Sequence, residues 1–324
     1  MIHSIKRYGR VLLAGIFMLL LWGCALQGHS PRRELKNSRI VVLLPGEGGD
    51  LSWNDTNMEG ISYCEEKLGI TIECRKNVQE TEFEQVLVEC AEKDYDLILA
   101  SGEQFTDSVN TTAERYPDTF FCVINGIRAD QENVASVRPR EYEASEMAAV
   151  ITGNIAETGT IGMVAGYPNE GMEHLLDVYE GKVREILEER GMEKIVFLRA
   201  YTNSWTDQGL ARKMAEQMIC SGAEILFVYS NEAGLGCIEA ARDQGTKVIG
   251  FSSNPTREHP DTVVASIKFD FGKLYEWILS RYENGKLRGK KLEEVGQEEG
   301  IFVPVYSSGI SPEIREKVKQ ASGE

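Results

Sequence analysis

Histidine is scarce in this chain, which has only four copies, at His3, His29, His174 and His259. None of them stands in H-E-x-x-H or at another spacing typical of a metal site, so we expect no zinc. The stretch GFSSN at 250–254 begins like the turn that holds a nucleophilic serine. It ends in asparagine, and His259 follows too closely for the usual order of a catalytic triad. The sequence therefore predicts a protein that is not an enzyme and needs no cofactor or metal.

Positive charge is also in short supply, because 35 Lys and Arg residues face 51 Asp and Glu residues, for a formal net charge of −16. Proteins that bind nucleic acid need clustered cations to contact the phosphates, so we expect no nucleic-acid partner. A polybasic patch that would hold the protein on a membrane surface is excluded for the same reason.

Long apolar stretches are missing except near the N-terminus, where VLLAGIFMLLLWG occupies residues 11–23 behind Lys6, Arg7 and Arg10. This run is shorter than the roughly 20 residues of a membrane span, and with its basic flank it is typical of a secretory signal. The run ends in LWGC, which resembles a bacterial lipobox that would place a lipid on Cys24. We therefore predict a lipoprotein signal peptide at 1–23 and a lipidated tether at 24–37. A plain signal anchor, or cleavage elsewhere, remains the alternative.

The cysteines form no C-x-x-C pair. With Cys24 lipidated, six remain, several of them within apolar runs, and we expect buried small hydrophobic residues rather than disulfides. These six are Cys64, Cys74, Cys90, Cys122, Cys220 and Cys237.

Apolar runs rich in β-branched residues alternate with amphipathic helical patterns through the remaining chain, which is the signature of βαβ units and parallel sheets. Two extended runs, at 133–140 and 261–270, stand between the two series and are interpreted as crossovers. We predict an α/β protein with two Rossmann-like lobes and a cleft at the carboxyl ends of their strands. The expected boundaries are 38–135 plus 253–264 for the first lobe and 136–252 plus 265–324 for the second. The expected strands begin near residues 39, 70, 96 and 119 in the first series and 160, 194, 224 and 247 in the second.

A glycine-rich loop, GEGGDL from Gly46, follows the first strand and invites comparison with phosphate-binding loops. Leu51 replaces the last glycine of G-x-G-x-x-G, and no Gly-Lys-Ser/Thr follows for a P-loop. Glu47 and Asp50 would also repel a phosphate. The loop must therefore serve another purpose.

Two loops between a strand and a helix share Ser-Trp-x-Asp, at 52–55 and 204–207, one in each predicted lobe. Facing indoles could sandwich a flat ligand, and the stacking of each ring pair contributes roughly 0.5–1.5 kcal/mol beyond area burial. Asp50, Asn54 and Asp207 would then hydrogen-bond the ligand's edge. The alternative is that each tryptophan packs on its own helix while serine and aspartate cap it.

From Arg39 to about Lys273 the order of motifs resembles the basic membrane lipoproteins, the PnrA-like nucleoside-binding lipoproteins of ABC importers, which have a type I periplasmic-binding-protein fold. The matching pieces are GGDLSWNDTNMEG, DYDLILASGEQFTD, ERYPDTFFCVING, NVASVRPREYEASEMAAVITG, GLGCIEAARDQGTKVIGF and VVASIKFD. The double tryptophan is similar to a Med-like branch, described as positive regulators of competence in bacilli.

The resemblance implies that Trp53 and Trp205 stack on a purine and that Lys268 lies in the site. The sequence departs from the family in the segment whose acidic residues hold ribose, because the family's GVDSDQ is replaced by GFSSNP at 250–255. In addition, Asn125 stands where the family has an aspartate at the end of the fourth strand of the first lobe. Because charge-assisted hydrogen bonds to a diol are lost, a modified nucleoside, a free base or another flat metabolite stands as an alternative to an ordinary nucleoside. The expected ligand-binding residues are Asp50, Trp53, Asn54, Ser101, Gly102, Asn125, Trp205, Asp207, Glu232, Gly234, Ser252, Asn254 and Lys268.

The sequence thus predicts a monomeric, lipid-anchored solute-binding protein on the extracytoplasmic face of the cell membrane, with an ABC permease and ATPase as partners. A Med-like sensor uncoupled from transport is the alternative. A hydrolase acting on nucleosides is a third hypothesis.

Overall fold

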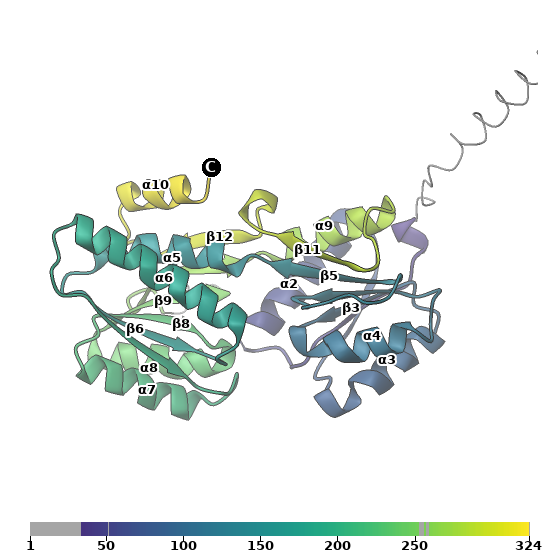
Figure 1. Ribbon diagram of the computed structural model, residues 1–324, viewed down its shortest axis with the longest axis horizontal. Coiled ribbons are helices and arrows are strands. Elements are labelled where there is room, and N and C mark those ends of the chain that lie inside the picture. The colour runs from purple at the N-terminus through teal and green to yellow at the C-terminus, as the bar shows by residue number, and fades with distance from the viewer. Residues whose placement is uncertain (1–33, 51, 253–255, 257–258, 324) are drawn as a thin grey trace, which may run out of the picture.

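The computed structural model describes residues 34–50, 52–252, 256 and 259–323. The predicted signal peptide, Cys24 and most of the tether lie outside these residues. The described chain forms two lobes that lie side by side, each built on one six-stranded sheet with helices on both faces (Figure 1). This arrangement confirms the predicted α/β architecture.

The first sheet has the strand order β11-β5-β4-β3-β1-β2, and its neighbouring strands all run parallel. Its central strands are buried along their whole length because helices cover both faces, which explains their continuous apolar runs. The strands are β1 (Ile40–Leu43), β2 (Ile72–Arg75), β3 (Leu97–Ser101), β4 (Phe120–Ile124), β5 (Val134–Pro139) and β11 (Lys291–Val295); the associated helices are η2 (Leu35–Asn37), α2 (Trp53–Leu68), η3 (Glu80–Glu82), α3 (Phe83–Glu92), η4 (Glu103–Phe105), α4 (Thr106–Ala113) and α9 (Phe271–Glu283).

The second sheet has the order β12-β10-β9-β8-β6-β7, parallel except where β12 pairs antiparallel with β10. The eight strands expected from the two sequence series are therefore present, four in each sheet. The strands here are β6 (Thr160–Ala165), β7 (Val196–Tyr201), β8 (Ile225–Tyr229), β9 (Lys247–Ser252), β10 (Val263–Phe269) and β12 (Phe302–Tyr306); the helices are α5 (Glu141–Ile155), α6 (Glu170–Glu189), α7 (Gln208–Cys220), η5 (Asn231–Ala233), α8 (Gly234–Gln244), η6 (Gln297–Glu299) and α10 (Pro312–Ala321).

The chain passes between the lobes after β5, after β10 and between β11 and β12. β5 belongs to the first sheet, and α5, which follows it, packs on α6 of the second lobe. β10 belongs to the second sheet, and α9, which follows it, packs on α2 of the first. The two extended runs expected as crossovers are thus the strands β5 and β10.

Strand pairing differs from the predicted lobe boundaries at three places. β5 pairs in the first sheet as far as Pro139, although residues 136–139 were expected in the second lobe. β11, expected in the second lobe, pairs with β5 in register from Lys291 opposite Ala135 to Val295 opposite Pro139. β10 pairs in the second sheet from Val263 to Phe269, with an irregularity at Val264, although its first two residues were expected in the first lobe. The sequence KLEEV of β11 is largely charged because this edge strand is mostly accessible to water, so it carries no apolar signal.

All six cysteines of the described chain are free thiols. Cys64, Cys90, Cys122 and Cys237 are buried, as predicted, and burial raises the pKa of each thiol, to about 12 for Cys64. Cys74 is half-buried and Cys220 is exposed, so the prediction of burial was wrong for Cys220.

Among the described helices, none combines the length and apolar character that a membrane span requires. In the same part of the chain, no three histidine, cysteine or acidic side chains gather in a way that could hold a metal ion.

Candidate ligand-binding cleft

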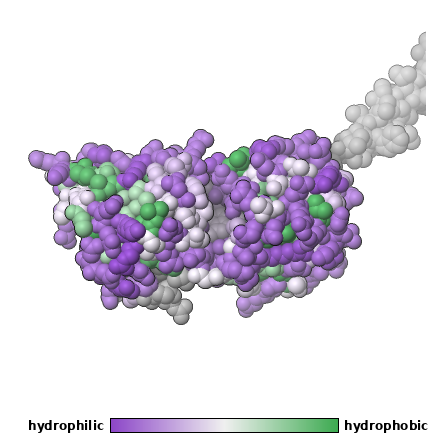
Figure 2. Space-filling model, turned by 90° about the horizontal axis from the view of Figure 1, so that it is seen from below, coloured by the Kyte–Doolittle hydropathy of each residue, from purple (hydrophilic) through white to green (hydrophobic). Residues whose placement is uncertain are grey.

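A cavity of about 860 Å³ lies between the two lobes, and Figure 2 shows the surface hollowed where they meet. This volume is within the range of roughly 300–1,000 Å³ typical of small-molecule sites. Its walls come from loops at the carboxyl ends of strands in both sheets, including Gly46 after β1, Gly102 after β3, Tyr167 after β6 and Trp205 after β7. This is the edge at which open parallel sheets bind ligands.

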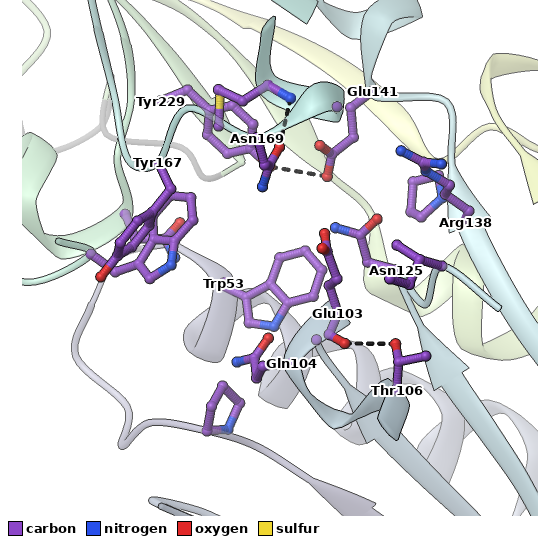
Figure 3. A pocket seen from close by; sticks show the side chains of 18 of the residues that line it. Trp53, Glu103, Gln104, Thr106, Asn125, Arg138, Glu141, Tyr167, Asn169 and Tyr229 are labelled. Atoms are coloured by element: carbon purple, nitrogen blue, oxygen red, sulfur yellow. Dashed lines mark hydrogen bonds between the residues drawn. The ribbon is translucent and has the colours of Figure 1, made fainter. Parts of the chain in front are cut away.

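Trp53 is the first residue of α2 and is only 8% exposed. Its indole meets the ring of Phe271 edge-on at 5.0 Å and that of Phe269 at 6.0 Å, and its Nε1–H donates to the carbonyl of Ser101 at 3.4 Å. The small exposed part of the side chain faces the cavity, where Figure 3 shows the indole beside Glu103 and Gln104. Trp53 is thus both a core residue of the first lobe and part of the cleft wall.

A buried polar network fixes this wall from behind. Asn57 lies one turn along α2, and its Nδ2 donates to the carbonyl of Trp53 at 2.7 Å. Its Oδ1 accepts from Ser101 Oγ at 2.8 Å and from Tyr275 Oη at 2.5 Å. Because buried polar groups are costly to leave unpaired, this network holds α2, β3 and α9 in one arrangement.

Trp205 lines the cavity from the second lobe, where it is half-buried beside Tyr167 at 5.4 Å and Tyr229 at 6.4 Å between ring centroids. The indole lies against Gly166, where a Cβ would come within 2.5 Å of its Cη2 atom. Only glycine therefore permits this position of the ring. Asp207 caps α7 by accepting from the Leu210 amide at 2.9 Å, which fixes the loop.

Asp50 holds the first tryptophan loop rather than lining the main cavity. Its carboxylate accepts from the amides of Ser52, Asn54 and Asp55 at 2.9–3.1 Å and from Asn54 Nδ2 at 2.9 Å. These four hydrogen bonds at the start of α2 occupy the lone pairs that we expected to accept hydrogen bonds from a ligand. Asn54, oriented by this contact, does line the cavity.

The structure brings five of the expected ligand-binding residues to the cavity wall: Trp53, Asn54, Gly102, Asn125 and Trp205. Gly102 and Asn125 directly follow β3 and β4 with φ of +139° and +60°, so the backbone turns sharply there.

The other expected residues are held elsewhere. Ser101 is buried behind Trp53, and Lys268 makes an ion pair with Glu59 of α2 at 2.6 Å. Glu232 accepts from Gln208 Nε2 at 3.0 Å. Gly234 begins α8 beside a separate small cavity that Asp50 also lines. The side chain of Ser252, and Asn254 as a whole, lie outside the described residues.

One hydrogen bond joins the two lobes at the edge of the cleft: Ser52 Oγ donates to Asn231 Oδ1 at 3.0 Å. Asn231 begins η5 after β8 and adopts a left-handed φ of +47°, which asparagine tolerates better than most residues. The contact ties the loop that carries Trp53 to the second lobe.

The model of the ABC transporter substrate-binding protein PnrA-like family matches residues 37–318. The chain belongs to this family.

Two relatives and one solved structure illustrate the likeness of this PnrA-like chain. An uncharacterized lipoprotein of Pyrococcus abyssi is 28% identical over 236 residues, which is 70% of this chain and 58% of the length of that protein. The transcriptional activator protein Med of Bacillus subtilis is 22% identical over 96% of this chain and 95% of its own. The crystal structure of an ABC transporter solute-binding protein from Aeropyrum pernix K1 superposes with a TM-score of 0.75 at 22% identity, covering 88% of this chain and 85% of that one.

These findings confirm the expected family and the type I periplasmic-binding-protein fold. The family binds solutes for ABC transporters, which implies a small-molecule ligand and transporter subunits as partners. Both the family and the fold are those of solute-binding proteins rather than enzymes.

Several side chains line the cavity of this PnrA-like protein that sequence reasoning missed. Most of them end a strand or begin a helix at the cleft edge, so the strand-end rule could have found Tyr167, Asn169 and Tyr229. Glu141 follows the first crossover, where the sequence offers no comparable signal. The missed residues include Glu103, Gln104, Thr106, Arg138, Glu141, Tyr142, Tyr167, Asn169, His174, Tyr229 and Asn231.

Glu141 has the most perturbed carboxyl group in the cleft. It is half-buried and lines the cavity, and Tyr229 Oη donates to its Oε1 at 2.9 Å (Figure 3). Loss of hydration raises the pKa of Glu141 from its ordinary 4.5 to about 7, the Tyr229 hydrogen bond and the charge of Arg138 oppose the rise, and Glu103 adds to it. This group therefore titrates near neutral pH.

Proposed function

We propose that this PnrA-like protein is a lipid-anchored extracytoplasmic receptor that binds a flat, purine-like ligand in the interlobe cleft and delivers it to an ABC permease and its ATPase. The observation that carries the proposal is the cavity of about 860 Å³ with one indole wall from each lobe. Aromatic walls supply a large apolar contact, and stacked rings add roughly 0.5–1.5 kcal/mol per pair.

The polar lining suits the edge of a heterocycle. Amide side chains of Gln104, Asn125 and Asn169 lie at the cavity, and amides can both donate to and accept from ring nitrogens and exocyclic groups (Figure 3). The proposed ligand includes a free base or a modified nucleoside as well as an ordinary nucleoside, because the carboxylates that hold ribose in the family are replaced in this sequence.

The proposal includes anchoring through a lipid on Cys24, followed by the tether at 24–37, with the protein acting as a monomer on the outer face of the membrane. Its support is the LWGC sequence together with lipoproteins among the relatives. Metabolic labelling with a radioactive fatty acid tests it: wild type should incorporate label and Cys24→Ala should not.

Calorimetric titration with nucleosides and bases tests the ligand, with tryptophan fluorescence as a second readout. Trp205→Ala should weaken binding about tenfold or more, since it removes one wall while leaving the core of the first lobe intact. Trp277→Phe is the matched control, because Trp277 lies on α9 against Arg281 and does not line the cavity. Affinity that survives in Trp205→Ala would rule out the sandwich.

A sensor role uncoupled from transport is the second candidate, favoured by the likeness to Med along nearly its whole length. Uptake of a labelled ligand by cells lacking the gene separates the two. Loss of uptake supports import, whereas unchanged uptake with altered transcription supports the sensor.

A further inference from the structure

Only one of the two carboxylate oxygens of Glu141 accepts a hydrogen bond from the described residues. Glu141 opens α5 directly after the first crossover, and Tyr229 at the end of β8 donates to Oε1. Among the described residues no donor reaches Oε2. Figure 3 shows the side chain directed into the cavity, with Glu103 of the first lobe directed into the same space. An acceptor oxygen in a partly desolvated wall is therefore open to a ligand.

The charges around the cavity favour a ligand that donates rather than accepts. Of the two guanidinium groups at the wall, Arg140 is paired with Glu143 at 2.5 Å and with Glu299 at 3.8 Å. The carboxylates of the cavity wall therefore outnumber the one remaining guanidinium group, Arg138, and they would repel an anionic ligand. The acidic lining residues are Glu80, Glu103, Asp107, Glu141, Glu170 and Glu294, of which Asp107 is paired with Arg128 at 2.7 Å.

We propose that Glu141 is the specificity-determining residue of the cleft: its Oε2 accepts a hydrogen bond from an N–H group on the edge of a flat ligand, so the protein selects rings that bear amino or protonated nitrogens. The inference rests on the proposed function, because it assumes a purine-like ring between the aromatic walls. Hydrogen bonds to a charged acceptor are roughly twice as strong as neutral ones, which makes this contact a strong selector.

Protonation of Glu141 makes the selection between ligands depend on pH. Burial and the nearby Glu103 raise the pKa of Glu141 to about 7, while Tyr229 and Arg138 oppose the rise. Protonation converts the acceptor oxygen into a hydroxyl donor, which opposes a ligand N–H. The preference for amino-bearing rings should therefore weaken as the pH falls below about 7.

Purine nucleosides with one sugar and different ring edges test the inference by calorimetry at pH 7.5. Adenosine and guanosine carry exocyclic amino groups, purine riboside carries no N–H on its ring edge, and xanthosine is anionic at this pH. We expect adenosine or guanosine to bind about tenfold or more tightly than purine riboside, and xanthosine to bind most weakly.

Glu141→Gln should abolish the preference, because Gln offers its one oxygen to Tyr229 and directs an amide donor at the ligand. Glu146→Gln, on the same helix but outside the cavity lining, should keep it. Between pH 7.5 and 5.5 the preference should decline in wild type and stay flat in Glu141→Gln.

The outcomes separate the two proposals. Equal binding of adenosine, guanosine and purine riboside, or a preference that survives in Glu141→Gln, overturns the role of Glu141 while purine binding stands. Adenine and guanine are titrated beside the nucleosides, because the proposed ligand includes a free base. Failure of every nucleoside and of both bases to bind wild type overturns the purine-like ligand and this inference with it.

Discussion

Replacing Glu141 by glutamine should stabilise the protein at alkaline pH. Glutamine keeps the shape of the side chain and the hydrogen bond from Tyr229, but it carries no charge to desolvate. The pKa of Glu141 is raised from 4.5 to about 7 in the folded protein, so the folded state binds the proton more tightly than the unfolded state. The wild-type carboxyl therefore lowers stability as the pH rises from 4.5 through 7, and its cost is fully present above that range.

The size of the effect follows from the same shift. Each pKa unit corresponds to about 1.4 kcal/mol, which gives a ceiling of about 3 kcal/mol for the ionised carboxylate. Water in the cleft reaches part of the side chain and reduces this figure. The substitution also removes a negative charge from the first turn of α5, where such a charge stabilises the helix, and this loss lowers the free energy of unfolding by roughly 0.3–1 kcal/mol. We therefore expect Glu141→Gln to raise the free energy of unfolding by about 1–2 kcal/mol at pH 8.

Urea denaturation followed by circular dichroism, at several pH values from 5 to 8, measures this difference. The gain should grow with pH and level off above about 7. Glu146→Gln, on the same helix, should show no such growth. A gain in Glu141→Gln that does not change with pH, or a loss of stability at pH 8, would refute the reasoning that desolvation dominates this site.

Three further substitutions test the packing around the cleft. Gly60→Ala should destabilise the protein by about 2 kcal/mol or more in urea, because its Cβ would lie 2.6 Å from the backbone of α9; near-native stability would show that the helices can separate freely. Gly166→Ala should displace Trp205 and weaken ligand binding with a changed fluorescence spectrum, and unchanged values for both would contradict the contact. Ser52→Ala removes the bond to Asn231 and should favour a more open protein by about 1 kcal/mol, seen as a larger radius of gyration in X-ray scattering; an unchanged radius would assign the bond no role in closure.

The lobes were predictable because their signals are local. Apolar strands buried on both faces read as continuous runs, and the helices between them have one apolar face, so eight strands fell where the sequence placed them. β11 was not predicted in the first lobe, because an edge strand with charged residues has no such pattern.

The tryptophan loops show the limit of this reasoning. The sequence places both at strand ends, and the structure puts both at one cavity. The sequence could not show that Trp53 is largely buried. Phe269 and Phe271, which pack on its ring, come from the second crossover, more than 200 residues away. Nor could the sequence show that Lys268 is held by Glu59.

The sequence by itself determined the two parallel-sheet lobes, the family and the pair of tryptophan loops, since periodicity and motif order are properties of neighbouring residues. Only the tertiary structure decided which polar groups face the cleft. Asp50 is occupied by the helix it caps, whereas Glu141 keeps one oxygen open and has a raised pKa. Hydration and hydrogen bonding depend on segments that the crossovers bring together, so a carboxylate's role cannot be read from its neighbours in the chain.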